Sequence, residues 1–152
     1  MDKGYKRPES VLVVIHTPDL QCLLLERARH PGYWQSVTGS REDDESFLQT
    51  AVREVGEETG LIVEASELLS WPGENIYAIM PEWRHRYAPG VTHNHERVFS
   101  LCLPAPVDIR IAPDEHRAWR WLPCAKAAAA CFSASNREAI LSLRKRQDIP
   151  QL

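Results

Sequence analysis

Short hydrophobic runs separated by polar turns occupy the first quarter of the chain. Residues 9–16 (ESVLVVIH) and 21–27 (QCLLLER) are rich in Val, Ile and Leu, and a turn at Thr17, Pro18 and Asp19 separates them. Runs of this length and composition, bounded by turn residues, predict two strands that pair as a β-hairpin. A further strand is predicted over residues 34–38, directly before a glycine.

Later runs of the same kind predict four more strands, over residues 61–65, 74–80, 96–103 and 119–122, with a polar loop over residues 81–94. The end of the chain is helical in pattern. Residues 125–131 are alanine-rich, and Ser135 followed by Glu138 resembles a capping box that opens a helix ending near residue 146. Strands in the middle and helices around them predict a mixed sheet covered by helices. No repeat or linker is visible, so we expect a single domain over residues 1–152.

Residues 39–61, GSREDDESFLQTAVREVGEETGL, follow a helical pattern instead. The apolar residues that recur at helical spacing are Leu48, Ala51, Val52 and Val55. They predict one buried stripe on a helix over residues 46–58. Ser46 and Gln49 resemble a capping box at its start, and Gly60 follows its end as a C-cap glycine does. The predicted unit is strand, glycine turn, acidic helix and glycine.

Glu54, Glu57 and Glu58 lie on adjacent turns of this helix, away from the apolar stripe. Like charges at this spacing repel and destabilise an isolated helix. A divalent cation among them offsets that cost, because Mg²⁺ prefers carboxylate oxygens. The pattern therefore indicates a metal site, with a charged surface helix as the alternative.

The acidic segment matches every fixed position of the Nudix box, nine positions over 23 residues. These positions are Gly39, Glu45, Arg53, Glu54, Val55, Glu57, Glu58, Gly60 and Leu61. The chain thus resembles a Nudix hydrolase. The resemblance implies an α/β/α sandwich, a cofactor of Mg²⁺ with Mn²⁺ as a substitute, and hydrolysis of a diphosphate linkage.

The resemblance also implies roles for the carboxylates. Glu54, Glu58 and Glu115 match the metal ligands of the family, and Asp114 competes with Glu115 for its role. Glu58 also counts among the catalytic residues. Glu57 is either a third ligand from the helix or the general base, and its spacing does not decide between them. Hydrolysis needs an activated water and screened phosphate charge, both of which a divalent ion supplies.

Arg53 points away from the apolar stripe and lies two helical turns from Glu45. We expect an ion pair between them that fixes the glycine turn against the helix. Direct contact between Arg53 and phosphate is the alternative, and we count Arg53 among the candidate catalytic residues.

Composition narrows the possible partners. The formal net charge is −3, which disfavours binding to nucleic acid polymers through nonspecific attraction. No run of about 18 apolar residues predicts a membrane span, and the N-terminus does not resemble a signal peptide. We therefore expect a cytoplasmic protein. The four cysteines have no zinc-binding spacing, and Cys22 and Cys102 are expected in the core.

Segments outside the box are similar to a bacterial folate-pathway branch of the family, the dihydroneopterin triphosphate pyrophosphatases. The similar segments cover residues 6–8, 33–40, 84–91 and 135–137. The resemblance implies release of pyrophosphate from dihydroneopterin triphosphate, leaving the monophosphate. It also implies contacts to this small-molecule substrate from Lys6, Arg27, Thr38, Tyr77, Ala78, Ile79, Met80 and Ser133.

Two alternatives stay open. One is a broader (d)NTP pyrophosphatase, such as a dATP hydrolase or a nucleotide-pool cleaner. The other is an inactive Nudix domain that only binds a ligand; such domains generally lose box carboxylates, and all of them are present here. The loop with Arg84, His85 and Arg86 either closes on phosphates or is a solvated basic loop.

Overall fold

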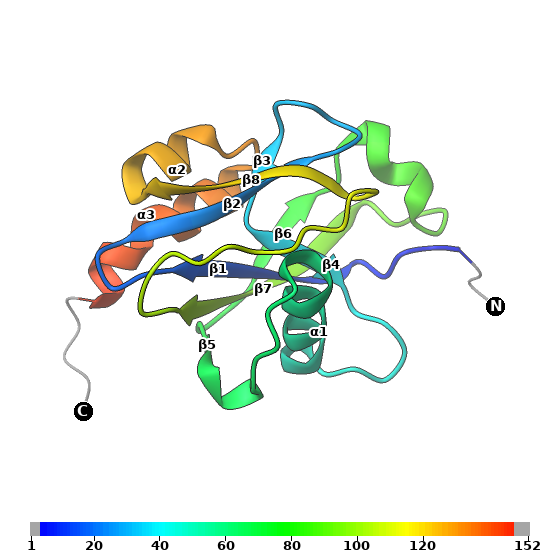
Figure 1. The fold of residues 1–152 in the computed structure, drawn as a ribbon. Helices are drawn as coiled ribbons and strands as arrows, with labels where there is room; N and C mark the ends of the chain where they lie inside the picture. Colours follow the sequence, from blue (N-terminus) through cyan, green and yellow to red (C-terminus); the bar gives the residue numbers. More distant parts are fainter. Residues whose placement is uncertain (1–3, 148–152) are drawn as a thin grey trace.

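The computed structural model describes residues 4–147. Its centre is an eight-stranded mixed sheet with the order β3-β2-β1-β7-β5, in which β4 pairs with β1, β6 with β7 and β8 with β2 (Figure 1). The strands are β1 (Glu9–His16), β2 (Gln21–Arg27), β3 (Trp34–Gln35), β4 (Val37–Ser40), β5 (Leu68–Ser70), β6 (Asn75–Ala78), β7 (His93–Cys102) and β8 (His116–Pro123). Strands β1 and β7 are parallel, and the other pairings of these strands are antiparallel.

Helices cover both faces of the sheet. Helix α1 (Phe47–Thr59) lies on one face, and α2 (Cys124–Ala130) and α3 (Ala134–Gln147) lie on the other (Figure 1). Two short 3₁₀ helices, η1 (Ala65–Glu67) and η2 (Pro81–Arg86), lie in the connections. The sequence pattern predicted a mixed sheet covered by helices, and the Nudix resemblance implied an α/β/α sandwich; the structure has both features.

Strand β1 separates two hydrophobic cores. Val11, Val13 and Ile15 pack with α1, whereas Leu12 and Val14 pack with α2 and α3. Successive side chains of a strand point to opposite faces, so a strand covered on both faces has to be apolar throughout. This explains the unbroken hydrophobic run of β1.

Several predicted elements have the predicted ends. Strands β1 and β2 match residues 9–16 and 21–27 and form the expected antiparallel pair. Ser46 is the N-cap of α1 and forms a reciprocal capping box with Gln49. Gly60 ends the helix in the left-handed conformation, with φ of 77°. That conformation favours glycine because it has no Cβ.

The prediction of a strand over residues 61–65 is wrong. Leu61 and Val63 pack against the core, Ile62 is 92% exposed, and the segment forms no ladder before η1. The predicted strand over residues 34–38 is two short strands, and Gly39 and Ser40 belong to β4 rather than to a turn. The loop over residues 81–94 contains η2, and β7 already begins at His93.

Two smaller corrections concern the cap of the last helix and the location of one cysteine. Helix α3 begins at Ala134, and the Ser133 hydroxyl accepts a hydrogen bond of 3.1 Å from the Asn136 N–H. The cap is therefore Ser133, and the predicted capping box at Ser135 is wrong. Cys22 is buried as expected, but Cys102 is exposed.

Among the described residues, no helix combines the length and apolar character that a bilayer span requires. The ends of the predicted domain, residues 1–3 and 148–152, lie outside the described residues.

Candidate active site

Glycine at position 39 allows α1 to approach the sheet. Gly39 pairs with Val11 of β1, and a Cβ added to Gly39 would lie 2.2 Å from the Glu54 carboxyl carbon. Any other residue would therefore displace the Glu54 side chain. The close approach holds a carboxylate of α1 directly against the end of β4.

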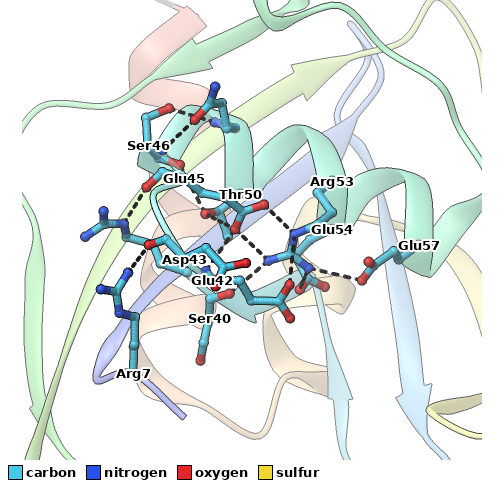
Figure 2. Close-up of polar contacts among 12 residues, drawn as sticks. Arg7, Ser40, Glu42, Asp43, Glu45, Ser46, Thr50, Arg53, Glu54 and Glu57 are labelled. Carbon is cyan, nitrogen blue, oxygen red and sulfur yellow. Dashed lines mark hydrogen bonds and ion pairs between the residues drawn. The ribbon is translucent and has the colours of Figure 1, made fainter. Parts of the chain in front are cut away.

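Arg53 connects the first part of the acidic segment to the carboxylates of α1 (Figure 2). Its Nε and Nη2 donate to the two carboxylate oxygens of Glu45, at 2.6 and 2.9 Å. Nη1 donates to Glu54 at 2.8 Å and to Glu57 at 3.2 Å, and Nη2 also donates to the Ser40 carbonyl at 3.0 Å. The predicted ion pair between Arg53 and Glu45 is present. Together with Glu54, Glu57 and the Ser40 carbonyl, it provides acceptors for all three guanidinium nitrogens of Arg53.

Glu45 is therefore held as an anion. Hydrogen bonds from Arg53 lower the pKa of Glu45 to about 2, helped by the Glu42 N–H and the Thr50 hydroxyl. The two-pronged contact between Arg53 and Glu45 is a strong geometry for an arginine–carboxylate pair. It closes the loop between β4 and α1.

Glu58 occupies the opposite environment, one turn beyond Glu54. It is 1% exposed, and its Oε1 has no hydrogen-bond partner among the described residues. Burial raises the pKa of Glu58 well above its usual range, and contact with Glu54 and the charge of Glu115 raise it further. One oxygen of this buried carboxyl group therefore has no donor within the described part of the chain, which is the situation expected at a cation site.

Glu115 faces Glu54 and Glu58 from the segment just before β8. Burial raises the pKa of Glu115, and the charges of Glu54, Asp114 and Glu57 add to this effect. Its charge also raises the pKa of Glu58, so Glu115 lies close to the carboxylates of α1. Asp114 is its direct neighbour and is also exposed, so the choice between them as a ligand stays a prediction.

Three cations lie beside these carboxylates. Burial lowers the pKa of Lys6 to about 8, and the charges of Arg86 and Arg27 lower it further. Glu54 and Glu58 are close enough to oppose that shift. The Lys6 N–H donates to the Arg86 carbonyl at 2.8 Å, which attaches the N-terminal segment to the end of η2. The three cations form a cluster suited to a polyphosphate.

Arg27 is oriented by two groups. Its guanidinium lies over the Trp83 ring, 5.1 Å from the centroid, and Nη1 donates to Gln35 at 3.4 Å. Its buried Nε has no partner among the described residues. A ligand oxygen is the natural acceptor for this unpaired donor.

The remaining predicted substrate residues are distributed over neighbouring elements. The backbone of Thr38 hydrogen-bonds to Glu58. Tyr77 and Ala78 lie in β6, Ile79 is buried, and Met80 precedes η2. Ser133 caps α3. The structure thus brings Lys6, Arg27 and Thr38 to the carboxylates. Residues 77–80 lie beyond β7 from β1, in and after β6, and Ser133 lies at the start of α3, close to β3.

The donor set fits a hard divalent cation. Glu54, Glu58 and Glu115 supply carboxylate oxygens, and the buried Oε1 of Glu58 has no partner among the described residues. Within residues 4–147, no three His, Cys, Asp or Glu side chains lie together in a group that could hold a metal ion by itself. Mg²⁺ does not need three protein ligands, because it commonly binds through one or two carboxylates together with water and substrate phosphates.

His116 is a site residue that the sequence prediction did not include. It is 3% exposed, and its Nε2 lies 3.8 Å from Glu58 Oε1 and 3.5 Å from Gln35 Nε2. Burial and then the charge of Arg27 lower the pKa of His116 to about 4, so the ring is neutral at pH 7. Its position directly after Glu115 was the available signal. Gln35 had no comparable signal.

Comparison with known proteins gives consistent matches over nearly the whole chain. The NUDIX domain model matches residues 6–143. The chain is 46% identical over 142 residues to the dihydroneopterin triphosphate diphosphatase of Escherichia coli K12. The alignment covers 91% of this chain and 93% of that protein. The corresponding protein of Haemophilus influenzae is 43% identical over 139 residues, covering 90% and 87% of the two chains.

The fold is similar to a solved structure of the same kind. The structure of the E. coli dihydroneopterin triphosphate pyrophosphohydrolase aligns with a TM-score of 0.87 and 44% sequence identity, covering 95% of this chain and 99% of that chain.

Proposed function

This chain belongs to the Nudix family, and from that membership we propose that it converts dihydroneopterin triphosphate to dihydroneopterin monophosphate and pyrophosphate. The substrate part of the proposal is supported by relatives at 46% and 43% identity that carry this activity in their names. Both relatives align over about nine-tenths of the chain, so the similarity extends well beyond the Nudix box.

One structural observation carries the reaction class. The carboxylates Glu54, Glu58 and Glu115 lie next to the cations Lys6, Arg27 and Arg86, in a site where Glu58 is buried and its Oε1 has no hydrogen-bond partner among the described residues. A polyphosphate needs cations for its outer oxygens and a divalent ion between phosphate and carboxylate. The site offers the cations directly, and its carboxylates are suited to hold the divalent ion.

We assign the chain's own residues as follows. Lys6, Arg27 and Arg86 hold the triphosphate, and Trp83 and Gln35 orient Arg27. Water adds across the anhydride between the α and β phosphates, the P–O bond breaks, and pyrophosphate leaves. Glu57 accepts the proton of the attacking water. Arg53 contacts both Glu54 and Glu57 and is a positioning residue for them.

A divalent ion, Mg²⁺ or its substitute Mn²⁺, would be held by Glu54, Glu58 and Glu115. When bound, it neutralises phosphate charge and lowers the pKa of water.

The test compares kcat/KM for dihydroneopterin triphosphate, dATP and 8-oxo-dGTP, measured as pyrophosphate release with Mg²⁺ and after chelation with EDTA. We expect the pterin triphosphate to be preferred and EDTA to abolish release. A preference for 8-oxo-dGTP or dATP would replace the proposal with the broader nucleotide pyrophosphatase, and no release with any of them would mean an inactive domain. The folate-pathway role, the cytoplasmic location and the single-domain organisation stay predictions.

A further inference from the structure

A row of polar side chains in the interior joins the phosphate end of the site to its metal end. Arg27 Nη1 donates to Gln35 Oε1 at 3.4 Å, and Gln35 Nε2 lies 3.5 Å from His116 Nε2. The same nitrogen of His116 lies 3.8 Å from Glu58 Oε1. Gln35 is 5% exposed, His116 3% and Glu58 1%, so most of the row is inside the protein. We call these four side chains the buried row.

The buried row contains unpaired polar atoms. Within residues 4–147, five buried side-chain nitrogen or oxygen atoms have no hydrogen-bond partner, and three of them are Arg27 Nε, His116 Nδ1 and Glu58 Oε1. Buried polar atoms are normally paired, so a concentration of unpaired ones requires an explanation. Arg27 has an unpaired donor at the phosphate end, and Glu58 has an unpaired acceptor at the metal end. This is the arrangement expected where an anion and a cation bind together.

A β-bulge brings His116 into the buried row. Glu26 of β2 pairs with Ala118 of β8. The same register would place Arg117 opposite the next residue, Arg27, but the ladder shifts there and His116 pairs with Arg27 instead. Bulges redirect side chains and are frequent next to active sites. The bulge therefore places an imidazole, rather than a second guanidinium, beside Arg27.

The hydrogen bonds define what His116 offers to Glu58. Arg27 has only donors, so the oxygen of the Gln35 amide faces Arg27 and its NH₂ group faces His116. His116 Nε2 must then accept, which leaves the ring proton on Nδ1. The ring therefore packs against Glu58 without giving it a positive charge or a proton. A guanidinium in this place would pair with the carboxylate and compete with a divalent ion.

We propose that Gln35 and His116 are positioning residues that couple the phosphate-binding Arg27 to the metal-binding Glu58. The inference rests on the proposed function for its two ligands, a polyphosphate and a divalent ion, and does not depend on the heterocycle. Gln35 orients Arg27 and His116, and His116 in turn limits where the Glu58 carboxylate can lie. Groups that orient a metal ligand from behind contribute about ten- to a hundredfold to metal affinity or activity.

Gln35→Leu separates a coupled row from separate local contacts. Among the described residues, the Gln35 side chain hydrogen-bonds to Arg27 and His116 and to no carboxylate. Mn²⁺ affinity is measured without substrate, by electron paramagnetic resonance of the free ion. We expect Gln35→Leu to weaken Mn²⁺ binding by about tenfold, because His116 loses the group that orients it. Unchanged Mn²⁺ affinity would overturn the proposal, since Gln35 would then serve Arg27 alone.

His116→Leu tests the buried row from the other end. Affinity for inorganic tripolyphosphate is measured by calorimetry in EDTA, so that no divalent ion contributes. We expect a loss of about tenfold, because Gln35 loses its second partner and no longer holds Arg27 in one orientation. His116→Gln, which keeps a polar group near the position of Nε2, should recover most of the affinity for both ligands. Equal losses in His116→Leu and His116→Gln would also overturn the proposal.

The matched control is Ser100→Ala. Ser100 of β7 is 5% exposed and accepts a hydrogen bond of 3.0 Å from Trp71 Nε1 in the other core. The substitution should lower the thermal unfolding temperature and leave both affinities unchanged. A comparable loss of Mn²⁺ affinity in Ser100→Ala would attribute the effect to general destabilisation and overturn the proposal.

The wild-type protein distinguishes the two levels of the argument. If it binds neither Mn²⁺ nor tripolyphosphate, the proposed function fails and the coupling fails with it. Normal wild-type binding together with unchanged Mn²⁺ affinity in Gln35→Leu rejects the coupling alone.

Discussion

The two ends of the acidic segment place glutamates in opposite environments. At its beginning, Glu45 is fixed by both nitrogens of one edge of Arg53, and its pKa falls to about 2. At the end of α1, Glu58 is buried beside Glu54 and Glu115, and its pKa rises well above the usual range. Both oxygens of Glu45 are hydrogen-bonded by the protein, whereas Oε1 of Glu58 has no partner among the described residues and is available to a ligand.

The difference separates a structural role from a functional one within the same motif. Satisfied ion pairs hold a loop in place, whereas an uncompensated carboxylate stores an unfavourable interaction that a cation relieves. Spacing alone does not make this distinction, because both residues are fixed positions of the same pattern.

The strongest test removes the uncompensated charge. Glu58→Gln should lower kcat by roughly 10²–10⁴-fold, the range for loss of a positioned catalytic carboxylate. Stability should stay the same or rise, because the amide buries no charge. Pyrophosphate release and thermal unfolding measure the two effects, and Glu138→Gln on the exposed side of α3 is the control. Normal turnover in Glu58→Gln would remove the metal-site assignment.

The next test displaces Glu54 without changing any charge. In Gly39→Ala, the new methyl group meets the Glu54 carboxyl group at 2.2 Å, so the carboxylate must move. A shift of about 1 Å at a reacting group costs about 10²-fold in rate, which we expect in kcat.

Helix α1 offers a matched control for this substitution. A Cβ at Gly56 would find its nearest atom, the Leu61 carbonyl oxygen, 3.7 Å away. Gly56→Ala should therefore stabilise the protein by about 0.5–1 kcal/mol and leave kcat unchanged. Equal activities of the two variants would contradict the role of Gly39.

A smaller effect is expected at the beginning of the acidic segment, where Arg53 pairs with Glu45. Arg53→Lys keeps the charge but loses the two-pronged contact with Glu45, so the free energy of unfolding should fall by about 1–2 kcal/mol in urea titrations. The turnover number should fall as well, because Glu54 and Glu57 lose a donor. Arg117→Lys is the control, since the Arg117 side chain is 55% exposed in its 3.5 Å pair with Glu26, and the pair should contribute less than about 0.5 kcal/mol. Equal urea midpoints for the two variants would show that Arg53 anchors nothing.

The smallest effect concerns acid stability. The pKa of Glu45 is lower in the folded protein than in the unfolded chain, so its contribution to stability is present above about pH 4.5 and is lost as the pH falls towards 2. Glu45→Gln should therefore show a shallower loss of stability between these values, measured by urea unfolding in EDTA. Parallel curves for variant and wild type would contradict the assigned pair.

Local sequence signals were sufficient to predict β1, β2 and α1. The β-branched run of β1 is covered on both faces, and α1 carries its own start and stop signals in Ser46 and Gly60. Elements that depend on distant partners were harder. Residues 61–65 have strand-like composition, but no neighbouring strand is available to them, and strand preference depends on such context.

The same limit applies to the candidate site. The spacing of Glu54 and Glu58 in the sequence was enough to predict that they lie close together, because one helix carries both. His116 resembled an ordinary strand residue, since its neighbours Gln35 and Arg27 are remote in the sequence. The pairing of Gly39 with β1 was also missed, because a glycine before a helix normally indicates a turn.

Strand β1 lies between β4 and β7, with Ser10 and Val11 paired to Ser40 and Gly39 on one side and to Glu96 and Arg97 on the other. Two ladder spacings, about 10 Å, therefore separate the β4 and β7 backbones. Main-chain hydrogen bonds to β1 set that separation, so a distortion of β1 would also shift the Gly39 backbone against which the Glu54 carboxylate lies.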